Sequence, residues 1–365
     1  MSRKTVLSES HVQLGARMVD FSGWDMPLQY DGILAEHHRT RTDVSMFDTC
    51  HMGRFLVTGP GTRAALDQLL AVDLEAMTDG QCKYGFLLRE DGGILDDVIV
   101  YRFSAGRWMI VVNAGTQAGD RDWIRARLPA TVTFTDVSRS LAKIDVQGPH
   151  ALACVARVCG IEVDSLRYFR FRTFDYGGEA IVSRTGYTGE KGVELYVESG
   201  RMVELWNRFL ADGVKPAGLG ARDTLRLEMC YPLYGQDLTS ETTPIEADKE
   251  KFVYFNKDFI GKDALIKSNK PYRKLINFTA ASRRAPRHNY RIFMNGEDIG
   301  IVTSGSFSPS LSCGIGMGYV NTPCSAGAEV MLKDNNVEIS ALVTKGPFYK
   351  KGTAKILEDS HAHTR

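Results

Sequence analysis

Apolar positions along the chain recur with two spacings, one typical of strands and the other typical of helices. Short apolar runs rich in β-branched residues, bounded by Gly, Pro and polar residues, predict strands. We expect strands at residues 54–58, 83–88, 94–101, 108–113, 143–146 and 179–184. Apolar residues at helical spacing predict helices at residues 62–70, 117–128, 149–158, 199–209 and 218–230. The polar turn at 104–107 is expected to join the strands on either side of it into a hairpin.

The pattern changes after about residue 265. From Lys274 onward, short apolar runs alternate with turns rich in Gly, Pro and Ser, which is typical of a small antiparallel barrel or roll. We expect strands there at residues 299–305, 316–320, 330–333 and 341–345. The segment 266–273 is predicted to be a linker, and the polar tail from Glu358 is predicted to fray.

Two adjacent carboxylates interrupt the apolar run that follows the Gly pair at 92–93. Successive side chains of a strand point to opposite faces, so Asp96 and Asp97 cannot share one environment. Asp97 shares its face with Leu95, Ile99 and Tyr101. A carboxylate on an apolar face needs a partner or a shifted pKa, which makes Asp97 a candidate for chemistry. The alternative is an Asp on an edge strand that caps a turn.

Composition narrows the class of protein. The 365 residues suggest two or three domains, and 43% hydrophobic with 24% charged residues is an ordinary globular balance. A net charge of +1 gives no reason to expect nucleic acid or a membrane surface as a partner. Because no long apolar run or signal segment is seen, we expect a cytoplasmic protein.

The sequence has 7 cysteines, an odd number, and no CxxC motif, which favours buried thiols in a reducing compartment. The 8 histidines form no zinc pattern, so no metal site is predicted.

Ten motifs, in one order along nearly the whole chain, resemble the aminomethyltransferase (T-protein) family of the glycine cleavage system. They are MVDFSGWDMPLQY (18–30), MFDTCHMG (46–53), GGILDDVIVY (92–101), VVNAG (111–115), VQGP (146–149), SRTGYTGEKGVE (183–194), GLGARDTLRLE (218–228), LYGQDL (233–238), KDFIGKDAL (257–265) and TSGSFSP (303–309).

The resemblance implies an α+β fold, three-lobed and cloverleaf-like, around a central hole that binds tetrahydrofolate. It implies a folate-binding catalytic region of two interleaved lobes at 1–270 and a C-terminal β-barrel domain at 271–365. The family enzyme takes the aminomethyl group carried on the lipoyl arm of the H-protein. It releases ammonia and passes the one-carbon unit to tetrahydrofolate, forming 5,10-methylenetetrahydrofolate.

The resemblance also assigns roles to residues. Asp97, the second Asp of its pair, would be the catalytic carboxylate, with Asp96 as the alternative. Glu194 would accept two hydrogen bonds from the pterin edge, a pairing that charge strengthens. Arg222 would bind the folate carboxylate end, unless it only forms a salt bridge with Asp223 or Glu228. Aromatic and polar side chains would line the folate slot, although each could equally belong to the core: Tyr84, Tyr101, Asn113, Tyr168, Tyr187 and Met52.

The chain departs from the family at residues 244–253, where relatives carry an apolar turn of Gly-Leu type and a Trp. Here Asp248, Lys249, Glu250 and Lys251 replace them. Since this segment lies near the substrate side in relatives, the identity of the one-carbon donor stays open.

The main alternative function is that of a tetrahydrofolate-dependent demethylase of a small sulfonium, ether or amine. A non-catalytic folate-binding factor is disfavoured because the chain has no Lys-Gly-Cys motif. A module fused to an oxidase is disfavoured because the chain has no dinucleotide fingerprint.

Overall fold

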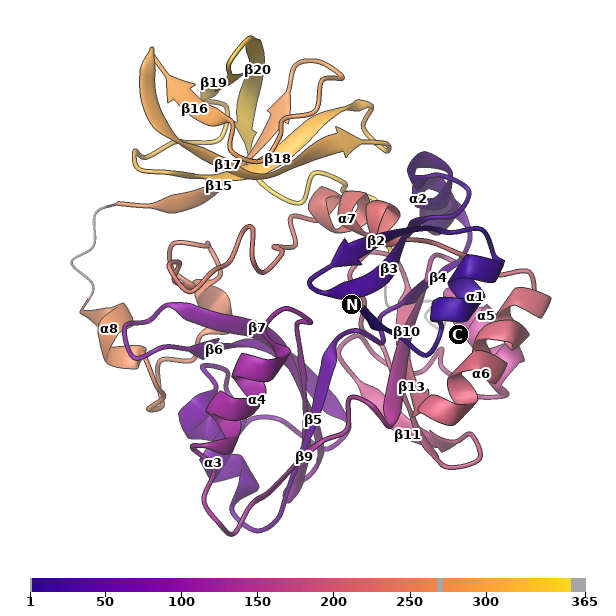
Figure 1. Ribbon diagram of the computed structural model, residues 1–365. Helices are drawn as coiled ribbons and strands as arrows, with labels where there is room; N and C mark the ends of the chain where they lie inside the picture. Colours follow the sequence, from indigo (N-terminus) through magenta and orange to yellow (C-terminus); the bar gives the residue numbers. More distant parts are fainter. Residues whose placement is uncertain (1, 268–271, 356–365) are drawn as a thin grey trace, which may run out of the picture. The chain divides into compact units, whose positions relative to one another are not determined.

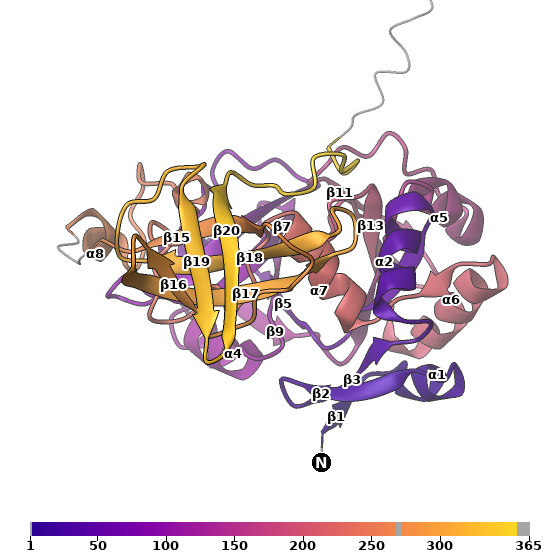
Figure 2. The ribbon, with the colours of Figure 1, turned by 90° about the horizontal axis from the view of Figure 1, so that it is seen from above.

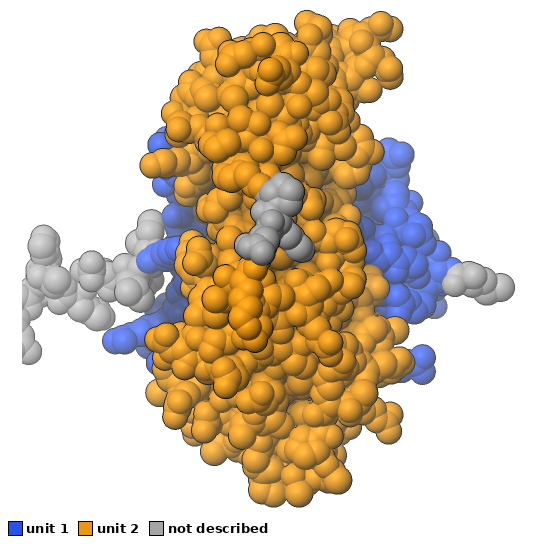
Figure 3. All heavy atoms as spheres, turned by 90° about the vertical axis from the view of Figure 1, so that its left-hand side faces the viewer, with its two compact units in different colours: residues 1–51, 138–225, 350–365 blue, residues 52–137, 226–349 orange. Residues whose placement is uncertain are grey.

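The computed structural model describes residues 2–267 and 272–355 and divides the chain into two compact units. Figure 3 colours the two units, and each is assembled from segments that are separate in sequence. Unit 1 comprises residues 1–51, 138–225 and 350–365, and unit 2 comprises residues 52–137 and 226–349. The predicted domain boundary at 270/271 and the predicted frayed tail from Glu358 lie outside the described residues.

Unit 1 is built on a six-stranded sheet. Its strand order is β11 (Phe171–Asp175), β12 (Glu179–Ser183), β13 (Gly192–Glu198), β10 (Leu141–Gln147), β4 (Ser45–Asp48) and β14 (Lys215–Pro216). A smaller sheet has the order β1 (Arg3–Lys4), β3 (Trp24–Gln29) and β2 (Arg17–Phe21). The helices of this unit are α1 (Ser8–Gln13), α2 (Ile33–Thr42), α5 (Ala151–Cys159) and α6 (Ser199–Ala211). Figure 1 shows α5 and α6 beside β10 and β13, and apolar side chains of both helices join the core of this sheet.

The last described residues of the chain belong to unit 1. The Thr353 hydroxyl donates to the Glu190 carboxylate at 2.5 Å and accepts from the backbone N–H of Lys191 at 2.8 Å. The backbone N–H of Ala354 donates to the carbonyl of Gly189 at 3.0 Å. Because Glu190 is buried and also pairs with Arg41 at 2.9 Å, this late segment satisfies a carboxylate inside the unit.

Unit 2 contains a five-stranded sheet and a barrel. The sheet order is β6 (Gln81–Leu88), β7 (Ile94–Ser104), β8 (Arg107–Val112), β5 (Gly53–Thr58) and β9 (Thr133–Asp136). The predicted hairpin is observed, since β7 pairs with β8 in antiparallel register. Gly92 precedes it at a φ of +83°, a left-handed conformation that favours glycine. Two helices pack on the core of this sheet: α3 (Thr62–Leu69) and α4 (Gln117–Arg125).

The predicted C-terminal barrel is confirmed. Six strands close in the order β15 (Lys274–Ala280), β18 (Cys313–Val320), β17 (Glu297–Ser308), β16 (Arg291–Met294), β19 (Glu329–Asp334) and β20 (Val337–Thr344), and Figure 2 shows them from above. The remaining elements are α7 (Leu219–Glu228), which carries the chain from unit 1 to unit 2, the short helix η1 (Glu250–Phe252) and α8 (Lys262–Ile266). With strands and helices mixed in both units, the predicted α+β class is confirmed.

Some local predictions need correction. The helix predicted at 149–158 begins two residues later, at Ala151, and the helix predicted from residue 199 begins at Ser199 without a side-chain capping bond. The Ser199 hydroxyl instead donates to the carbonyl of Arg139 at 2.8 Å. Within residues 2–267 and 272–355, no helix is long and apolar enough to cross a membrane.

Candidate functional site

Asp97 lies on β7 and is held by two side chains of unit 2. The Tyr84 hydroxyl, from the neighbouring strand β6, donates to Asp97 Oδ2 at 2.9 Å. The Asn113 amide, directly after β8, donates to Asp97 Oδ1 at 2.8 Å. Burial raises the pKa of Asp97 to about 6, although both hydrogen bonds lower it. The carboxyl group is therefore oriented and is poised to exchange a proton near neutral pH.

The neighbouring Asp96 is the more deeply buried of the two carboxylates. Side chains of β7 alternate as predicted, but the face of Asp96, with Ile94, Val98 and Val100, is the fully buried one. Asp97 lies on the other, half-buried face, which it shares with Leu95 and Ile99 as predicted. The two carboxylates also share a partner, because the Asn113 amide donates to Asp96 Oδ1 at 2.8 Å as well.

Further predicted residues of unit 2 differ in exposure. Tyr84 is half-buried, and its ring meets the edges of Phe86 and Phe252, with centroids 5.3 and 4.9 Å apart. Tyr101 is wholly buried, so in this structure its ring belongs to the core. Met52 is half-buried directly before β5 and accepts a hydrogen bond from Arg54 at its backbone carbonyl.

The segment 244–253, which departs from the family pattern, reaches the surroundings of Asp97 through Phe252. Phe252 packs on Tyr84, and Tyr84 donates to Asp97. Asp248 has a φ of +58°, a left-handed conformation, and pairs with Lys274 at 2.9 Å. Burial lowers the pKa of the half-buried Lys249. Through Phe252, this segment therefore contacts the ring of Tyr84, which positions Asp97. The same segment carries the charged residues Asp248 and Lys249.

In unit 1, Glu194 lies within a buried charge network. Asp145 on β10 and Glu194 on β13 are direct cross-strand partners. Lys143 lies between them, with Nζ 2.6 Å from Asp145 Oδ1 and 3.0 Å from Glu194 Oε1. The Tyr196 hydroxyl donates to Glu194 Oε2 at 3.0 Å. Lys143 and Tyr196 therefore hold the two oxygens of the Glu194 carboxylate in place.

Arg222, in the first turn of α7, is joined to this network. Its guanidinium donates to Asp145 Oδ2 at 2.8 Å and lies 4.8 Å over the ring of Tyr187. A salt bridge with Asp223 or Glu228 was the alternative to a binding role for Arg222; the ion pair of Arg222 seen among the described residues is with Asp145. Burial opposes ionisation of Asp145, but Lys143 and Arg222 lower its pKa below the ordinary value. The structure thus brings together three residues predicted separately: Glu194, Arg222 and Tyr187.

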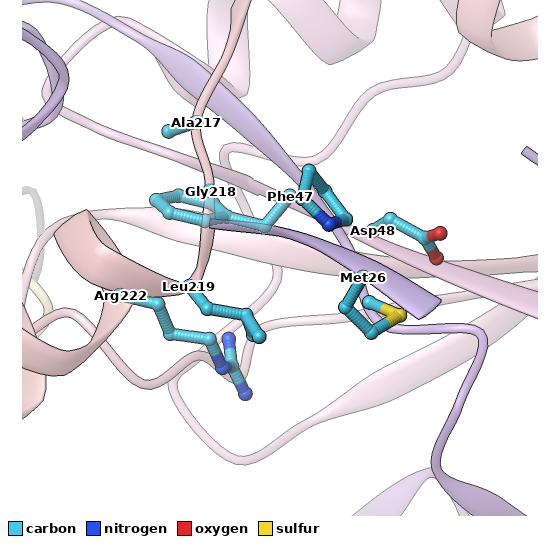
Figure 4. A pocket seen from close by; sticks show the side chains of 8 residues that line it. Met26, Phe47, Asp48, Ala217, Gly218, Leu219 and Arg222 are labelled. Atoms are coloured by element: carbon cyan, nitrogen blue, oxygen red, sulfur yellow. The ribbon is translucent and has the colours of Figure 1, made fainter. Parts of the chain in front are cut away.

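A shallow hollow lies beside Arg222 in unit 1. Figure 4 shows the side chains that line it: Met26, Pro27, Phe47, Asp48, Ala217, Gly218, Leu219 and Arg222. The hollow leaves no space for a molecule as small as water, so it does not enclose a folate.

Tyr168 lies on a separate loop of unit 1, where its ring meets the edge of Phe169 at 4.8 Å. Phe169 has a φ of +59°, and its backbone N–H donates to the carbonyl of Arg184 at 3.0 Å. Arg184 directly precedes the Gly-rich turn that ends at Glu194. The loop of Tyr168 is therefore fixed to the start of that turn.

Three charged residues were missed by the sequence reasoning: Lys143 and Asp145 of the network in unit 1, and the buried Asp120 of α4, whose charge acts on Asp96 in unit 2. The first two alternate with Ala142, Ile144 and Val146 on β10, and this strand pattern could have revealed a polar buried face. Asp120 was not recognisable, because an Asp in the first turn of a helix is ordinary. Among residues 2–267 and 272–355, no group of three or more His, Cys, Asp or Glu side chains is placed to hold a metal ion.

Comparison with known proteins gives consistent matches over the chain. Residues 7–257 match the family model described as the GCVT N-terminal domain. Residues 273–350 match the model described as the glycine cleavage T-protein C-terminal barrel domain. Together these two models leave few residues of the chain unmatched.

Curated relatives and a solved structure agree with the family models. An aminomethyltransferase from Listeria monocytogenes serotype 4a is 41% identical over 355 residues, covering 95% of this chain and 98% of the relative. An aminomethyltransferase from Halothermothrix orenii is also 41% identical, covering 95% and 99%. The crystal structure of glycine cleavage system aminomethyltransferase T from Bartonella henselae superposes with a TM-score of 0.91 at 34% identity, covering 97% of this chain and 99% of that one.

Proposed function

Because this chain belongs to the glycine cleavage T-protein family, we propose that it transfers the one-carbon unit of aminomethyl-lipoyl H-protein to tetrahydrofolate. The main prediction from the sequence, an aminomethyltransferase, is confirmed by relatives of that name at 41% identity. The demethylase alternative has no support among these relatives. The observation that carries the proposal in this chain is the Asp97 carboxyl group, held by Tyr84 and Asn113 at 2.9 and 2.8 Å.

Asp97 is the proposed catalytic residue. At neutral pH a carboxyl group with a pKa of about 6 is mostly ionised and can still take up a proton. Bound tetrahydrofolate would supply the amine nucleophile that accepts the one-carbon unit. Asp97 would take up a proton or stabilise positive charge as the new C–N bond forms and ammonia leaves. Contributions of this kind are typically on the order of 10²–10⁴ in rate.

Glu194 and Arg222 are the proposed binding residues of unit 1. The donor edge of a pterin presents an N–H beside an NH2 group, and a carboxylate accepts both at once. Glu194 fits this demand, because Lys143 and Tyr196 hold its carboxylate in place, each at 3.0 Å. Arg222 uses one guanidinium nitrogen on Asp145 and keeps other N–H groups for the folate carboxylate end.

The remaining predictions stay proposals. Tyr84, Asn113, Tyr168, Tyr187 and Met52 are proposed to contact the folate, each as a wall or a polar handle. Tyr101 is retained from the family pattern, although its complete burial favours a role in supporting the fold. The central hole, the domain division at 270/271 and the cytoplasmic location likewise remain predictions.

The direct test follows ammonia release from aminomethylated H-protein with tetrahydrofolate. We expect release that depends on both, and loss of most of it in the Asp97→Asn variant. The matched control is Asp334→Asn, which changes an exposed carboxylate of the same unit and should keep full turnover. Efficient demethylation of a free sulfonium, ether or amine without any response to H-protein would overturn the proposal in favour of the alternative.

A further inference from the structure

A third carboxyl group lies behind Asp97 and is not used by the proposed reaction. Asp120 projects from α4 and shares the inward face of that helix with Ile124, four residues later, which packs into the core of the sheet. Asp120 is 3% exposed and Asp96 is fully buried, and burial together with the nearby charge of Asp120 raises the pKa of Asp96. Two neighbouring buried carboxylates cannot both be ionised at low cost, which favours a single proton shared between them.

One carboxylate oxygen of Asp120 supports the idea that Asp96 and Asp120 share a proton. Its Oδ2 is buried and has no N–H or O–H donor among the residues that the structure describes. The nearby Thr116 hydroxyl donates to the carbonyl of Asn113 at 3.2 Å. A buried carboxylate oxygen without a donor is costly, and a proton held between the two acids removes that cost.

Asp96 transmits this arrangement to Asn113. Both oxygens of Asp96 accept from Asn113, Oδ2 from the backbone N–H and Oδ1 from the side-chain amide, each at 2.8 Å. These two bonds fix the amide with its NH2 group toward the carboxylates. The second hydrogen of that NH2 group is then available for Asp97 Oδ1, also at 2.8 Å.

We propose that Asp96 and Asp120 are positioning residues for Asp97: sharing one proton, they lock the Asn113 amide toward Asp97 and limit the negative charge beside it. The inference rests on the proposed catalytic role of Asp97. Asp120 orients Asp96, Asp96 orients Asn113, and Asn113 orients Asp97. Neither Asp120 nor Asp96 needs to touch substrate.

The other charged and titratable groups around this cluster are compatible with the arrangement. Asp237 also raises the pKa of Asp97, but it is paired with Arg226 at 2.8 Å. The three carboxyl groups together help raise the pKa of Tyr234, whose hydroxyl donates to the carbonyl of Ile94. Burial, reinforced by neighbouring carboxylates, raises the pKa of Asp96 well above its ordinary value and that of Asp120 to about 7. No lysine or arginine forms an ion pair with Asp96, Asp97 or Asp120 in the described part of the chain.

The test compares variants that differ in whether they can replace the shared proton. Asp120→Asn supplies a permanent N–H donor to Asp96, so its kcat at pH 7 should stay within about threefold of the unmodified enzyme. Asp120→Ala supplies none, and its kcat should fall by about tenfold or more. Asp96→Asn places an NH2 group against an N–H of Asn113, and its kcat should fall on the order of 10²-fold with little change in KM. Asp122→Asn, on the exposed side of α4, is the matched control.

The pH dependence separates positioning from mere support of the fold. Asp96→Asn releases Asn113, whose hydrogen bond lowers the pKa of Asp97, so the acidic limb of kcat should move to higher pH. Asp120→Asn should leave that limb in place or move it to lower pH. Carbon-13 titration of the Asp97 carboxyl group, assigned by comparison with Asp97→Asn, should show the same shifts without any assay of turnover.

The outcomes distinguish the two proposals. If Asp97→Asn abolishes turnover but the Asp96 and Asp120 variants keep the normal kcat, acidic limb and carbon-13 titration, the positioning role is wrong and the proposed function stands. If Asp97→Asn keeps turnover, the catalytic role of Asp97 is wrong, and the carbon-13 titration still decides whether Asp96 and Asp120 control its ionisation. Should Asp96→Asn fail to fold, the contrast between Asp120→Asn and Asp120→Ala decides the matter alone.

Discussion

Replacing Asp97 by Asn is expected to stabilise the folded protein while removing turnover. Burial raises the pKa of Asp97 to about 6 in the folded chain, against its ordinary value of 3.8. The folded chain therefore binds this proton more tightly than the unfolded chain does. Ionisation costs no stability below pH 3.8, the cost grows between pH 3.8 and 6, and it is fully present above pH 6.

The size of the effect follows from the same shift. A difference of roughly two pKa units at about 1.4 kcal/mol each corresponds to about 3 kcal/mol as an upper value. The amide fits the site, since its oxygen can accept from Asn113 and its NH2 group can donate to the Tyr84 hydroxyl oxygen. We therefore expect a gain in the free energy of unfolding of about 1–3 kcal/mol at pH 8 and almost none at pH 4.

Urea denaturation between pH 4 and pH 8 measures this gain, with ammonia release measured on the same preparations. The control Asp334→Asn removes an exposed carboxylate from β19 and should change neither quantity. A variant that is less stable than the unmodified protein at pH 8, or whose gain does not depend on pH, would show that Asp97 is not strained by its surroundings.

Other changes probe the remaining contacts. Lys143→Met leaves two buried carboxylates facing each other across β10 and β13. Urea denaturation should therefore show a loss in the free energy of unfolding of about 3 kcal/mol, which shrinks as the pH falls toward about 5. The control is Lys215→Met, which changes an exposed lysine, and equal effects of the two variants would contradict the network. Glu194→Ala should weaken tetrahydrofolate binding by about tenfold or more in calorimetry, and an unchanged affinity would exclude its pterin-edge role. Tyr84→Phe removes a hydrogen bond that lowers the pKa of Asp97, so the acidic limb of kcat should move to higher pH; a limb that stays in place would count against Asp97 as the titrating group.

The sequence predicted elements wherever local signals agreed with the final packing. The hairpin of β7 and β8 follows from two apolar β-branched runs around a polar turn. The barrel follows from short, evenly spaced strands between Gly- and Ser-rich turns. By contrast, β4 was not predicted, because Ser45, Met46, Phe47 and Asp48 carry little strand signal. They form a strand by pairing with β10 and β14, which are distant in sequence.

The candidate site was only partly accessible for a related reason. Asp97 stood out because its neighbours on one strand are apolar, and the family pattern pointed to Glu194 and Arg222. The partners of these residues come from other elements. Lys143 matters because the fold places it 3.0 Å from Glu194. Asp120 matters because the fold places its charge near Asp96. Such cross-element pairs cannot be read from periodicity in a single chain.

The segment that completes unit 1 has a consequence for biosynthesis. Thr353 and Ala354 satisfy groups at residues 189–191, while the whole of unit 2 is encoded before them. Since chains emerge from the ribosome in order, the barrel can close while Glu190 still awaits its last partner. Unit 1 can therefore reach its final form only after residue 354 has emerged, and a nascent chain halted at the barrel would carry an unfinished first unit beside a finished second one.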